Sequence, residues 1–449
     1  MLLKLAQTIN VYLSDYILIF LLVTVGLYYS IRTRFVQVRC LGEGFRKVFG
    51  NLSLRGGKQT NGMSSFQALA TAVAGQVGTG NIVGASGAIL LGGPGAIFWM
   101  WIIAFLGMAT IYAEATLAIK TRVVEPDGTI QGGPVYYISK AFQGRGGRFL
   151  TKFFAFATIL ALGLFGAMVQ SNSIAETFHT AFHVPGWVIG LVLTGLCAVI
   201  YLGGVQRLAA VTEKIVPAMA AIFLVGALAV LALRFFDVLE GFVLIFRYAF
   251  TPNAIIGGSL GAALKIAISQ GAKRGLFSNE AGMGSTPHAH AQANVQDPHE
   301  QGIVAMVGVF LDTFVVLTLN ALVIISTLYT SGGILAEGTI PAGITKANLA
   351  QTAFGLVLGS EIGAAFVAIC LLFFAFSTIL SWNLFGKINM VWLFGAKSAK
   401  LYTVLALVFV MLGSLASNDL VWELTDLFNN LMVVPNAAAL LVLGKMVHK

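Results

Sequence analysis

The sequence contains few charged residues. Only 10% of its 449 residues are Asp, Glu, Lys or Arg, whereas 57% are hydrophobic and the mean hydropathy is +0.87. Soluble domains carry roughly 25% charged residues, so the composition excludes a soluble globular protein. It predicts instead a polytopic protein of the lipid bilayer.

The sequence also lacks the motifs of several enzyme and pump classes. Cysteine is rare, and Cys40, Cys197 and Cys370 have no paired spacing, so their pattern predicts neither a disulfide framework nor a zinc site. There is no Gly-x-x-x-x-Gly-Lys-Ser/Thr loop, which disfavours an ATP-driven pump. There is no His-Glu-x-x-His motif and no convincing Ser and His pair within the apolar runs. We therefore expect no enzyme, no catalytic residues and no organic cofactor.

Runs of about 20 apolar residues are long enough to cross a bilayer as helices. The chain contains eleven such runs, which predict an all-α protein with about eleven transmembrane helices. The first run has no basic region before it and no evident cleavage site, so we expect it to be retained. The predicted spans are 12–31, 63–91, 94–120, 150–179, 185–204, 212–234, 255–290, 301–329, 361–383, 399–416 and 420–443.

Positive charge predicts the orientation of these spans. The first loop carries seven basic residues against only Glu43, which predicts a cytoplasmic loop, an outer N-terminus and a cytoplasmic C-terminus. With this orientation the later cytoplasmic loops are all basic, so the net charge of +9 reflects topology, and we expect no nucleic-acid partner. The basic residues of the first loop are Arg32, Arg34, Arg39, Arg46, Lys47, Arg55 and Lys58.

The span predicted at 63–91 has Gly78-Thr79-Gly80-Asn81 at its middle. Lipid offers no partner for freed backbone groups, so an irregular segment at this depth must be satisfied by protein or by a wet cavity. Secondary transporters build substrate and ion sites from such broken helices. The alternative is a face on which small residues let two membrane helices pack closely.

The span predicted at 255–290 is interrupted as well. Its centre contains four glycines together with Lys273, Arg274 and Glu280. If the first span is not part of the repeat, the other ten spans divide into two oppositely oriented halves of five. Each half then has a broken span at the corresponding position. We therefore predict an inverted-repeat transporter with the regions 1–60 (N-terminal helix and basic loop), 61–234 (first repeat), 235–254 (extracellular connection) and 255–449 (second repeat and tail).

The first break has the chemistry of a binding site for a zwitterion. Gly78 and Gly80 let backbone approach a ligand, and the half-helix that begins near Asn81 points its N–H groups at the place where a carboxylate would bind. The Thr79 hydroxyl can donate to the same carboxylate. The carbonyls of the preceding half-helix, around 74–77, suit a cation, and the side-chain oxygen of Asn81 lies beside them.

Three segments resemble the signatures of the alanine or glycine:cation symporter family, also called sodium:alanine symporters. They are 64–101, 131–137 (QGGPVYY) and 275–285 (GLFSNEAGMGS). The resemblance implies the LeuT-type fold in a prokaryotic inner membrane. It also implies uptake of small neutral amino acids such as alanine and glycine, coupled to Na⁺ or less often H⁺, by alternating access. Another small zwitterion, or a larger neutral amino acid such as glutamine, is the alternative, and a channel or an intramembrane enzyme is less favoured.

The resemblance also assigns roles to individual residues. It implies a cation site formed by Ala74 and Val77 with the adjacent hydroxyls of Ser377 and Thr378, although both hydroxyls could instead bond to the preceding turn. Gln170 becomes a substrate contact, where the residues alone leave an interhelical hydrogen bond equally open. The second unwound region is expected near 269–278, with Phe277 as an apolar cover and Trp382 shaping the pocket.

Several polar residues near the second break remain to be assigned. Asn279 and Glu280 are expected to support the gate or the break, and we favour bracing of exposed backbone amides by Glu280 over direct cation binding. Lys273 and Arg274 are expected to be partners of a gate or of the backbone and not substrate ligands. His288 and His290 have no neighbouring Cys or carboxylate cluster, so we expect solvated cytoplasmic histidines.

Overall fold

The computed structural model describes residues 2–50, 62–126, 130–251, 260–330 and 332–447. Arg55 and Lys58 of the predicted basic loop, and the start of the span predicted from 255, lie outside the described residues. Within them the chain is mainly helical, and the only sheet pairs the two short antiparallel strands β1 (Val123–Val124) and β2 (Ile130–Gln131).

Several helices of the N-terminal half are joined end to end. α1, η1 and α2 run without interruption, as do α9, η3 and α10. The bounds are α1 Leu2–Tyr12, η1 Leu13–Leu18, α2 Ile19–Arg32, α3 Val36–Arg39, α4 Leu41–Gly50, α5 Ser65–Gln76, η2 Gly80–Gly84, α6 Ala85–Gly92, α7 Gly95–Thr121, α8 Pro134–Ala141, α9 Gly144–Thr158, η3 Ile159–Gly166, α10 Ala167–Phe182, α11 Gly186–Leu202 and α12 Gly204–Leu233.

The C-terminal half begins with a helix in the segment predicted as an extracellular connection. That helix is α13, Phe235–Phe250, and whether it lies outside the membrane stays a prediction. The remaining bounds are α14 Leu260–Asn279, α15 Pro287–His290, α16 Pro298–Val309, η4 Phe310–Leu317, α17 Thr318–Leu328, α18 Leu349–Leu358, α19 Ser360–Phe394, α20 Ser398–Gly413, α21 Asn418–Val442 and η5 Leu443–Met446.

The length and composition of the helices fit a membrane protein. Among the described residues, seven helical segments are long and apolar enough to cross a bilayer. Shorter apolar helices add to these at Gly80–Gly92, Gly186–Leu202, Leu349–Leu358 and Ser398–Gly413. The total of eleven spans stays a prediction.

The first predicted break is present but narrow. A capping box between Ser64 and Gln67 starts α5, which ends at Gln76. Val77 then leaves helical geometry with ψ of 87°, and the helix resumes as η2 at Gly80. The interruption is therefore centred on Val77 and Gly78, slightly earlier than the glycine pattern suggested.

The second break lies later than predicted. The expectation of an unwound region at 269–278 is wrong, because α14 is helical to Asn279 and the interruption covers 280–286. Gly271 belongs to a packing face: a Cβ there would lie 2.5 Å from Trp99 Cβ of α7. Positive φ angles appear instead at Glu280 (59°), Gly282 (91°) and Gly284 (79°), where the chain turns.

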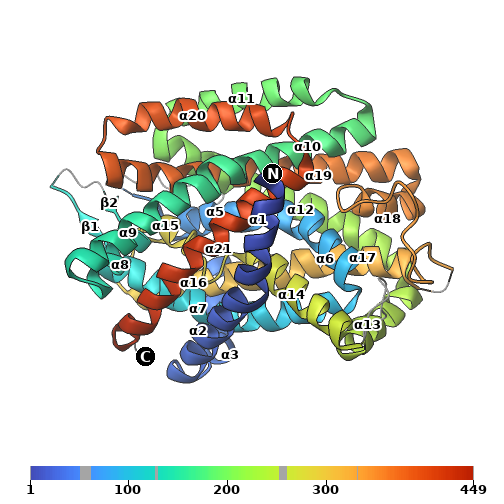
Figure 1. The fold of residues 1–449 in the computed structure, drawn as a ribbon, viewed down its shortest axis with the longest axis horizontal. Helices are drawn as coiled ribbons and strands as arrows, with labels where there is room; N and C mark the ends of the chain where they lie inside the picture. Colours follow the sequence, from blue (N-terminus) through green and yellow to red (C-terminus); the bar gives the residue numbers. More distant parts are fainter. Residues whose placement is uncertain (1, 51–61, 127–129, 252–259, 331, 448–449) are drawn as a thin grey trace.

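The packing brings both broken helices to the interior of the bundle. Figure 1 shows α11 and α20 side by side along one edge, and α1 beside α21 near the centre of the view, in agreement with their contacts. α14 packs on α6 and α7, and α5 packs on α12, α16 and α19. Met63, just before α5, also pairs with the segment after α15, since its N–H donates to the Gln292 carbonyl at 2.9 Å.

Candidate functional site

The two interrupted helices approach each other at glycines. A Cβ on Gly80 would lie 2.8 Å from the Cα of Ser278 and 3.2 Å from the Phe277 ring. A Cβ on Gly78 would lie 2.4 Å from Thr378 Oγ1 and 3.2 Å from Gln170 Oε1. The glycines therefore allow close approach, and the site combines the first break, α14, α10 and α19.

The backbone amides freed at the first break are bonded by side chains. Gly78 N–H donates to Asn81 Oδ1 at 3.0 Å, and Thr79 N–H donates to Gln170 Oε1 at 3.2 Å. The Thr79 hydroxyl is fully buried and has no hydrogen-bond partner among the described residues. A polar atom in this state is available for a bound ligand.

Asp312 links the two breaks and was not among the residues predicted from the sequence. Its carboxylate, fully buried in η4, accepts from Asn81 Nδ2 at 2.7 Å, from Ser278 Oγ at 2.9 Å and from Thr313 Oγ1 at 2.8 Å. An acidic residue within an apolar span is a functional candidate by default, so its position inside the span predicted at 301–329 was a usable signal.

Three of the four predicted cation ligands lie together. Thr378 Oγ1 donates to the Ala74 carbonyl at 2.8 Å, and Ser377 Oγ lies 3.5 Å from the same oxygen. Both hydroxyls also lie within bonding distance of the Phe374 carbonyl one turn earlier, at 3.0 and 2.9 Å, so the alternative bonding is equally open to them. Val77 lies at the end of α5, where its backbone leaves the helix.

Aromatic rings cover one side of the breaks. The Phe277 ring meets the Trp382 ring edge-on at a centroid distance of 5.8 Å, and the Trp422 ring of α21 at 4.8 Å. Trp422 was not predicted. The guanidinium of Arg274 stacks over it at 4.7 Å, and Lys346 Nζ lies over the same ring at 5.2 Å.

Lys273 and Arg274 both pair with Asp426 of α21. The closest distances are 2.9 Å from Lys273 Nζ and 3.0 Å from Arg274 Nη2 to Asp426 Oδ2. Burial, followed by the charge of Arg274, lowers the pKa of Lys346 from its ordinary value. This segment of the molecule therefore concentrates cations around a single buried carboxylate.

The second break is held by Glu114 of α7, by Asn279 at the end of α14 and by Glu280 of the break itself. Glu114 of α7 accepts from the N–H groups of Gly282 at 3.0 Å and Gly284 at 3.1 Å. Glu280 accepts from Ser285 Oγ and Trp382 Nε1. The expectation that Glu280 braces exposed backbone amides is therefore wrong, because Glu114 accepts from those amides. Asn279 caps the turn, because its Oδ1 accepts from Ala281 N–H at 3.0 Å and its carbonyl accepts from Gln76 Nε2 at 2.8 Å.

The expectation of solvated histidines after the second break is wrong. His288 is 0% exposed and His290 is 1% exposed. His288 bonds through Nδ1 to the Ser285 carbonyl at 2.7 Å and through Nε2 to Asn389 at 2.8 Å. The short helix α15 packs between α5, α7 and α19, which the local sequence does not reveal.

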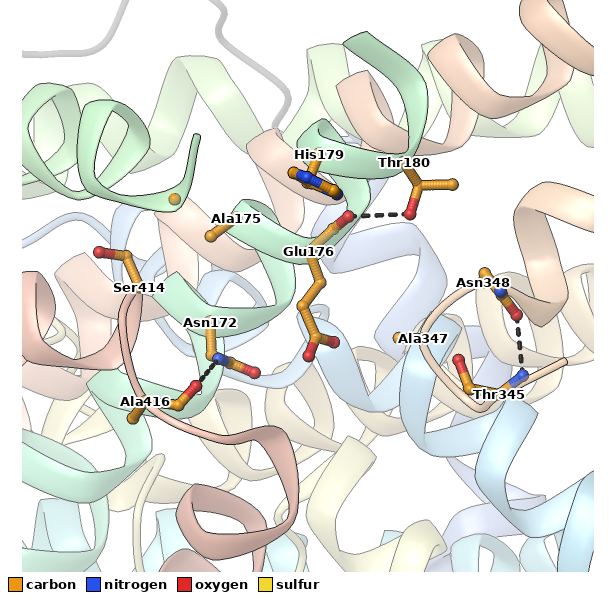
Figure 2. Close-up of a pocket in the computed structure, with 11 residues that line it drawn as sticks. Asn172, Ala175, Glu176, His179, Thr180, Thr345, Ala347, Asn348, Ser414 and Ala416 are labelled. Atoms are coloured by element: carbon orange, nitrogen blue, oxygen red, sulfur yellow. Dashed lines mark hydrogen bonds between the residues drawn. The ribbon is translucent and has the colours of Figure 1, made fainter. Parts of the chain in front are cut away.

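A cavity of about 330 Å³ opens near the C-terminal end of α10. Figure 2 shows the carboxylate of Glu176 pointing into it, between Asn172 and Ala347. Glu176 accepts from Asn418 Nδ2 at 2.9 Å, and Asn172 donates to the carbonyls of Gly413 and Ala416, so Asn172 joins helices at its rim.

A protein-family model matches the chain over its full length. The model described as the sodium:alanine symporter family matches residues 1–449. The chain belongs to this family. Membership confirms the resemblance noted in the sequence, and it identifies a transporter and a multi-pass membrane protein.

Members of the family align over nearly the full chain. The sodium/alanine symporter AgcS of Methanococcus maripaludis is 39% identical over 446 residues, covering 99% of this chain and 95% of that protein. A Bacillus subtilis protein named "Probable sodium/glutamine symporter GlnT" is 38% identical over 434 residues, covering 96% and 86%.

Solved structures of other transporters share the fold of this sodium:alanine symporter family member. MhsT in complex with L-phenylalanine gives a TM-score of 0.61 at 16% identity, covering 86% of this chain and 90% of that chain. A Na⁺-coupled sialic acid symporter in a substrate-bound outward-open state gives 0.54 at 13% identity, covering 89% and 81%. At these identities the similarity shows the fold alone, which is the LeuT-type fold predicted above.

Proposed function

We propose that the protein couples uptake of alanine or glycine to Na⁺ entry by alternating access. The observation that carries this proposal is the meeting of two interrupted helices at Gly80 and Ser278, with the buried Asp312 carboxylate joining them. Eleven spans, one N-terminal helix plus a five-plus-five inverted repeat, are the architecture that we infer for it. The paired breaks on α5 and α14 support that architecture.

The first break would bind the amino acid by its carboxylate. The Thr79 hydroxyl supplies an unused donor, and a ligand carboxylate could take over the Thr79 N–H now bonded to Gln170. Gln170 would then be released to contact the substrate. Asn81 would act by holding Gly78 N–H and Asp312 in place, which differs from the direct role expected from the sequence.

Size selection follows from the surroundings of this break. The Phe277 ring lies against the first break, 3.2 Å from where a Cβ on Gly80 would stand, and it packs edge-on against the Trp382 ring. These contacts favour a substrate with a methyl group or hydrogen as its side chain. Glutamine is the second candidate, since the relative from Bacillus subtilis described above is named for it.

One cation would bind at Ala74, Val77, Ser377 and Thr378. Binding would turn the Thr378 hydroxyl proton away from the Ala74 carbonyl, so that both oxygens face the ion. Neutral oxygens suit Na⁺ because they hold a monovalent hard ion without trapping it. Asp312 adds a buried carboxylate that would attract a second cation or carry a proton. The choice between Na⁺ and H⁺ as the coupling ion would therefore depend on this residue.

Access would alternate through closure above and below the breaks. The pairs of Lys273 and Arg274 with Asp426, beside Trp422 and Phe277, would close the predicted outer side. The Glu176 cavity lies on the same predicted side and would attract entering cations. Glu114, Asn279 and Glu280 would keep the second break open as the bundle moves.

Uptake into proteoliposomes tests the proposal. Radiolabelled alanine should accumulate under an inward Na⁺ gradient and exchange against internal alanine, because a carrier, unlike a channel, shows counterflow. Unlabelled glycine should compete strongly and glutamine weakly. Accumulation driven only by a proton gradient, or stronger competition by glutamine than by glycine, would contradict the assignment of ion or substrate.

A further inference from the structure

A second cluster of ligating side chains lies away from the breaks, at the start of α4 and α16. The Sγ atom of Cys40, a carboxylate oxygen of Glu43 and a ring nitrogen of His299 all lie within 4.8 Å of one another. His299 Nε2 and Glu43 Oε2 are 3.8 Å apart. Cysteine spacing alone did not predict this cluster, because His299 comes from a distant part of the chain.

The backbone presents the three side chains from two helices. The Cys40 carbonyl accepts from Gly44 N–H at 2.9 Å, so Cys40 directly precedes α4 and lies on the same face as Glu43 of its first turn, three residues later. His299 lies in the first turn of α16, where Asp297 Oδ1 accepts its N–H at 2.9 Å. An ion pair between Lys47 and Glu300 joins the same two helices one turn further along.

Tyr112 of α7 fixes the orientation of the histidine ring. Its hydroxyl lies 2.7 Å from His299 Nδ1, and the two rings meet edge-on at 5.6 Å. With Nδ1 bonded to Tyr112, Nε2 is the nitrogen that faces Glu43. A histidine that bonds a protein group through one ring nitrogen and faces other ligands through the second has the arrangement typical of metal sites.

We propose that Cys40, Glu43 and His299 bind a divalent cation of the zinc class. A thiolate, an imidazole and a carboxylate are the donors that Zn²⁺ and Co²⁺ accept, whereas Na⁺, Mg²⁺ and Ca²⁺ prefer oxygen alone. The thiolate and the carboxylate together balance the charge of the ion. A tetrahedral zinc site separates its ligand atoms by about 3.3–3.6 Å, so from separations of up to 4.8 Å the side chains must close by at most about 1.5 Å on binding.

The site is accessible from one side. Cys40 is 5% exposed and the His299 side chain 12%, but the Glu43 side chain is 34% exposed. The ion would enter past Glu43, and water would complete its fourth position. Occupancy would hold α4 against α16, the helix that continues through η4 to Asp312.

Cobalt binding tests this site in the purified full-length protein, without an affinity tag and with its thiols reduced. Titration with Co²⁺ should saturate at one equivalent and give a thiolate-to-cobalt absorption band that added Zn²⁺ removes. Cys40→Ser should abolish the band, and the control Cys197→Ser, at a buried cysteine of α11, should keep it. The absence of a band in the unmodified protein, or its persistence in Cys40→Ser, would overturn the proposal.

Two further variants separate metal binding from folding. Glu43→Gln changes the most exposed ligand and should weaken Co²⁺ binding at least tenfold in a protein that still folds. Tyr112→Phe keeps the ring and should weaken binding about 10-fold to 100-fold, as loss of a partner of a metal-bound histidine does. Unchanged Co²⁺ affinity in both variants would contradict the site. Because the assay measures binding alone, its outcome is independent of the proposed transport function.

Discussion

Two threonine hydroxyls near the first break differ in what they bond. Thr378 Oγ1 donates to a carbonyl at 2.8 Å, whereas the buried Thr79 Oγ1 has no partner among the described residues. A buried polar group without a partner costs about 1–3 kcal/mol. A substrate carboxylate that accepts from Thr79 would recover this free energy. A cation bound to Thr378 would instead replace the hydrogen bond from Thr378 to the Ala74 carbonyl.

Thr79→Val should weaken alanine binding without harming the fold. The variant removes a hydroxyl that bonds no other group in the described part of the chain, so we expect the alanine dissociation constant to rise about tenfold, equal to about 1.4 kcal/mol. Radiolabelled alanine binding and thermal unfolding in detergent measure the two effects. Thr327→Val is the matched control, since its buried hydroxyl bonds the Val323 carbonyl on α17. Normal alanine affinity in Thr79→Val would exclude Thr79 as a ligand.

Thr378→Ala should raise the Na⁺ concentration required for half-maximal uptake. It deletes one proposed ligand oxygen, and we expect a shift of about tenfold, again about 1.4 kcal/mol. Thr403→Ala is the control, because Thr403 makes the same type of bond to the preceding turn of α20, at 2.9 Å from the Ala399 carbonyl. If the Na⁺ dependence of Thr378→Ala in proteoliposomes matches that of the control, this cation site is wrong.

Helices α14 and α21 are joined by a buried charge cluster. The side chains of Lys273 and Arg274 are 12% and 10% exposed, and that of Asp426 is 4% exposed. Replacing a buried ion by a neutral group leaves its partners uncompensated. The carboxylate of Asp426 therefore stabilises the arrangement in which α14 lies against α21.

Asp426→Asn should lower thermal stability markedly. Removal of one member of a buried ion pair costs about 3–5 kcal/mol, measurable as an earlier unfolding transition in detergent. Asp419→Asn is the matched control, because Asp419 pairs with Lys346 at 3.5 Å but its side chain is 77% exposed. Exposed pairs contribute about 0–1 kcal/mol. Equal stability of the two variants would contradict the structural role given to Asp426.

The two breaks differ in how far the sequence could locate them. Gly78-Thr79-Gly80-Asn81 combines flexible and polar residues at midspan, and the first break lies there to within a residue or two. In α14 the glycines at 271 and 275 suggested an interruption, yet both lie within the helix, and Gly271 provides close packing against α7. The true second break depends on Glu114, a partner 168 residues from Gly282, which no local pattern indicates.

Long-range contacts explain the other differences. Asp312 could have been found from its place in an apolar run, but its partners Asn81 and Ser278 could not. The burial of His288 follows from the packing of α15 among α5, α7 and α19, and nothing in its neighbouring residues indicates it. Motifs therefore predicted the family and the position of the first break, whereas the polar network required the folded chain.

The orientation of the whole molecule can be tested by labelling. We predict that Ala336 faces the outside and Lys400 the cytoplasm, and both residues are exposed. The native cysteines are buried, so Ala336→Cys and Lys400→Cys introduce accessible thiols. In intact cells an impermeant maleimide should label only Ala336→Cys, and in lysed cells both variants. Labelling of Lys400→Cys in intact cells would reverse the predicted orientation.

The central claim is that a cation and an amino acid bind together where the two broken helices meet. The most direct measurement is equilibrium binding of radiolabelled alanine to the purified protein over a range of Na⁺ concentrations, at constant ionic strength. Sites that are coupled in this way should show alanine affinity rising with Na⁺, and Na⁺ affinity rising by the same factor with alanine. Alanine affinity that does not change with Na⁺ would contradict the account.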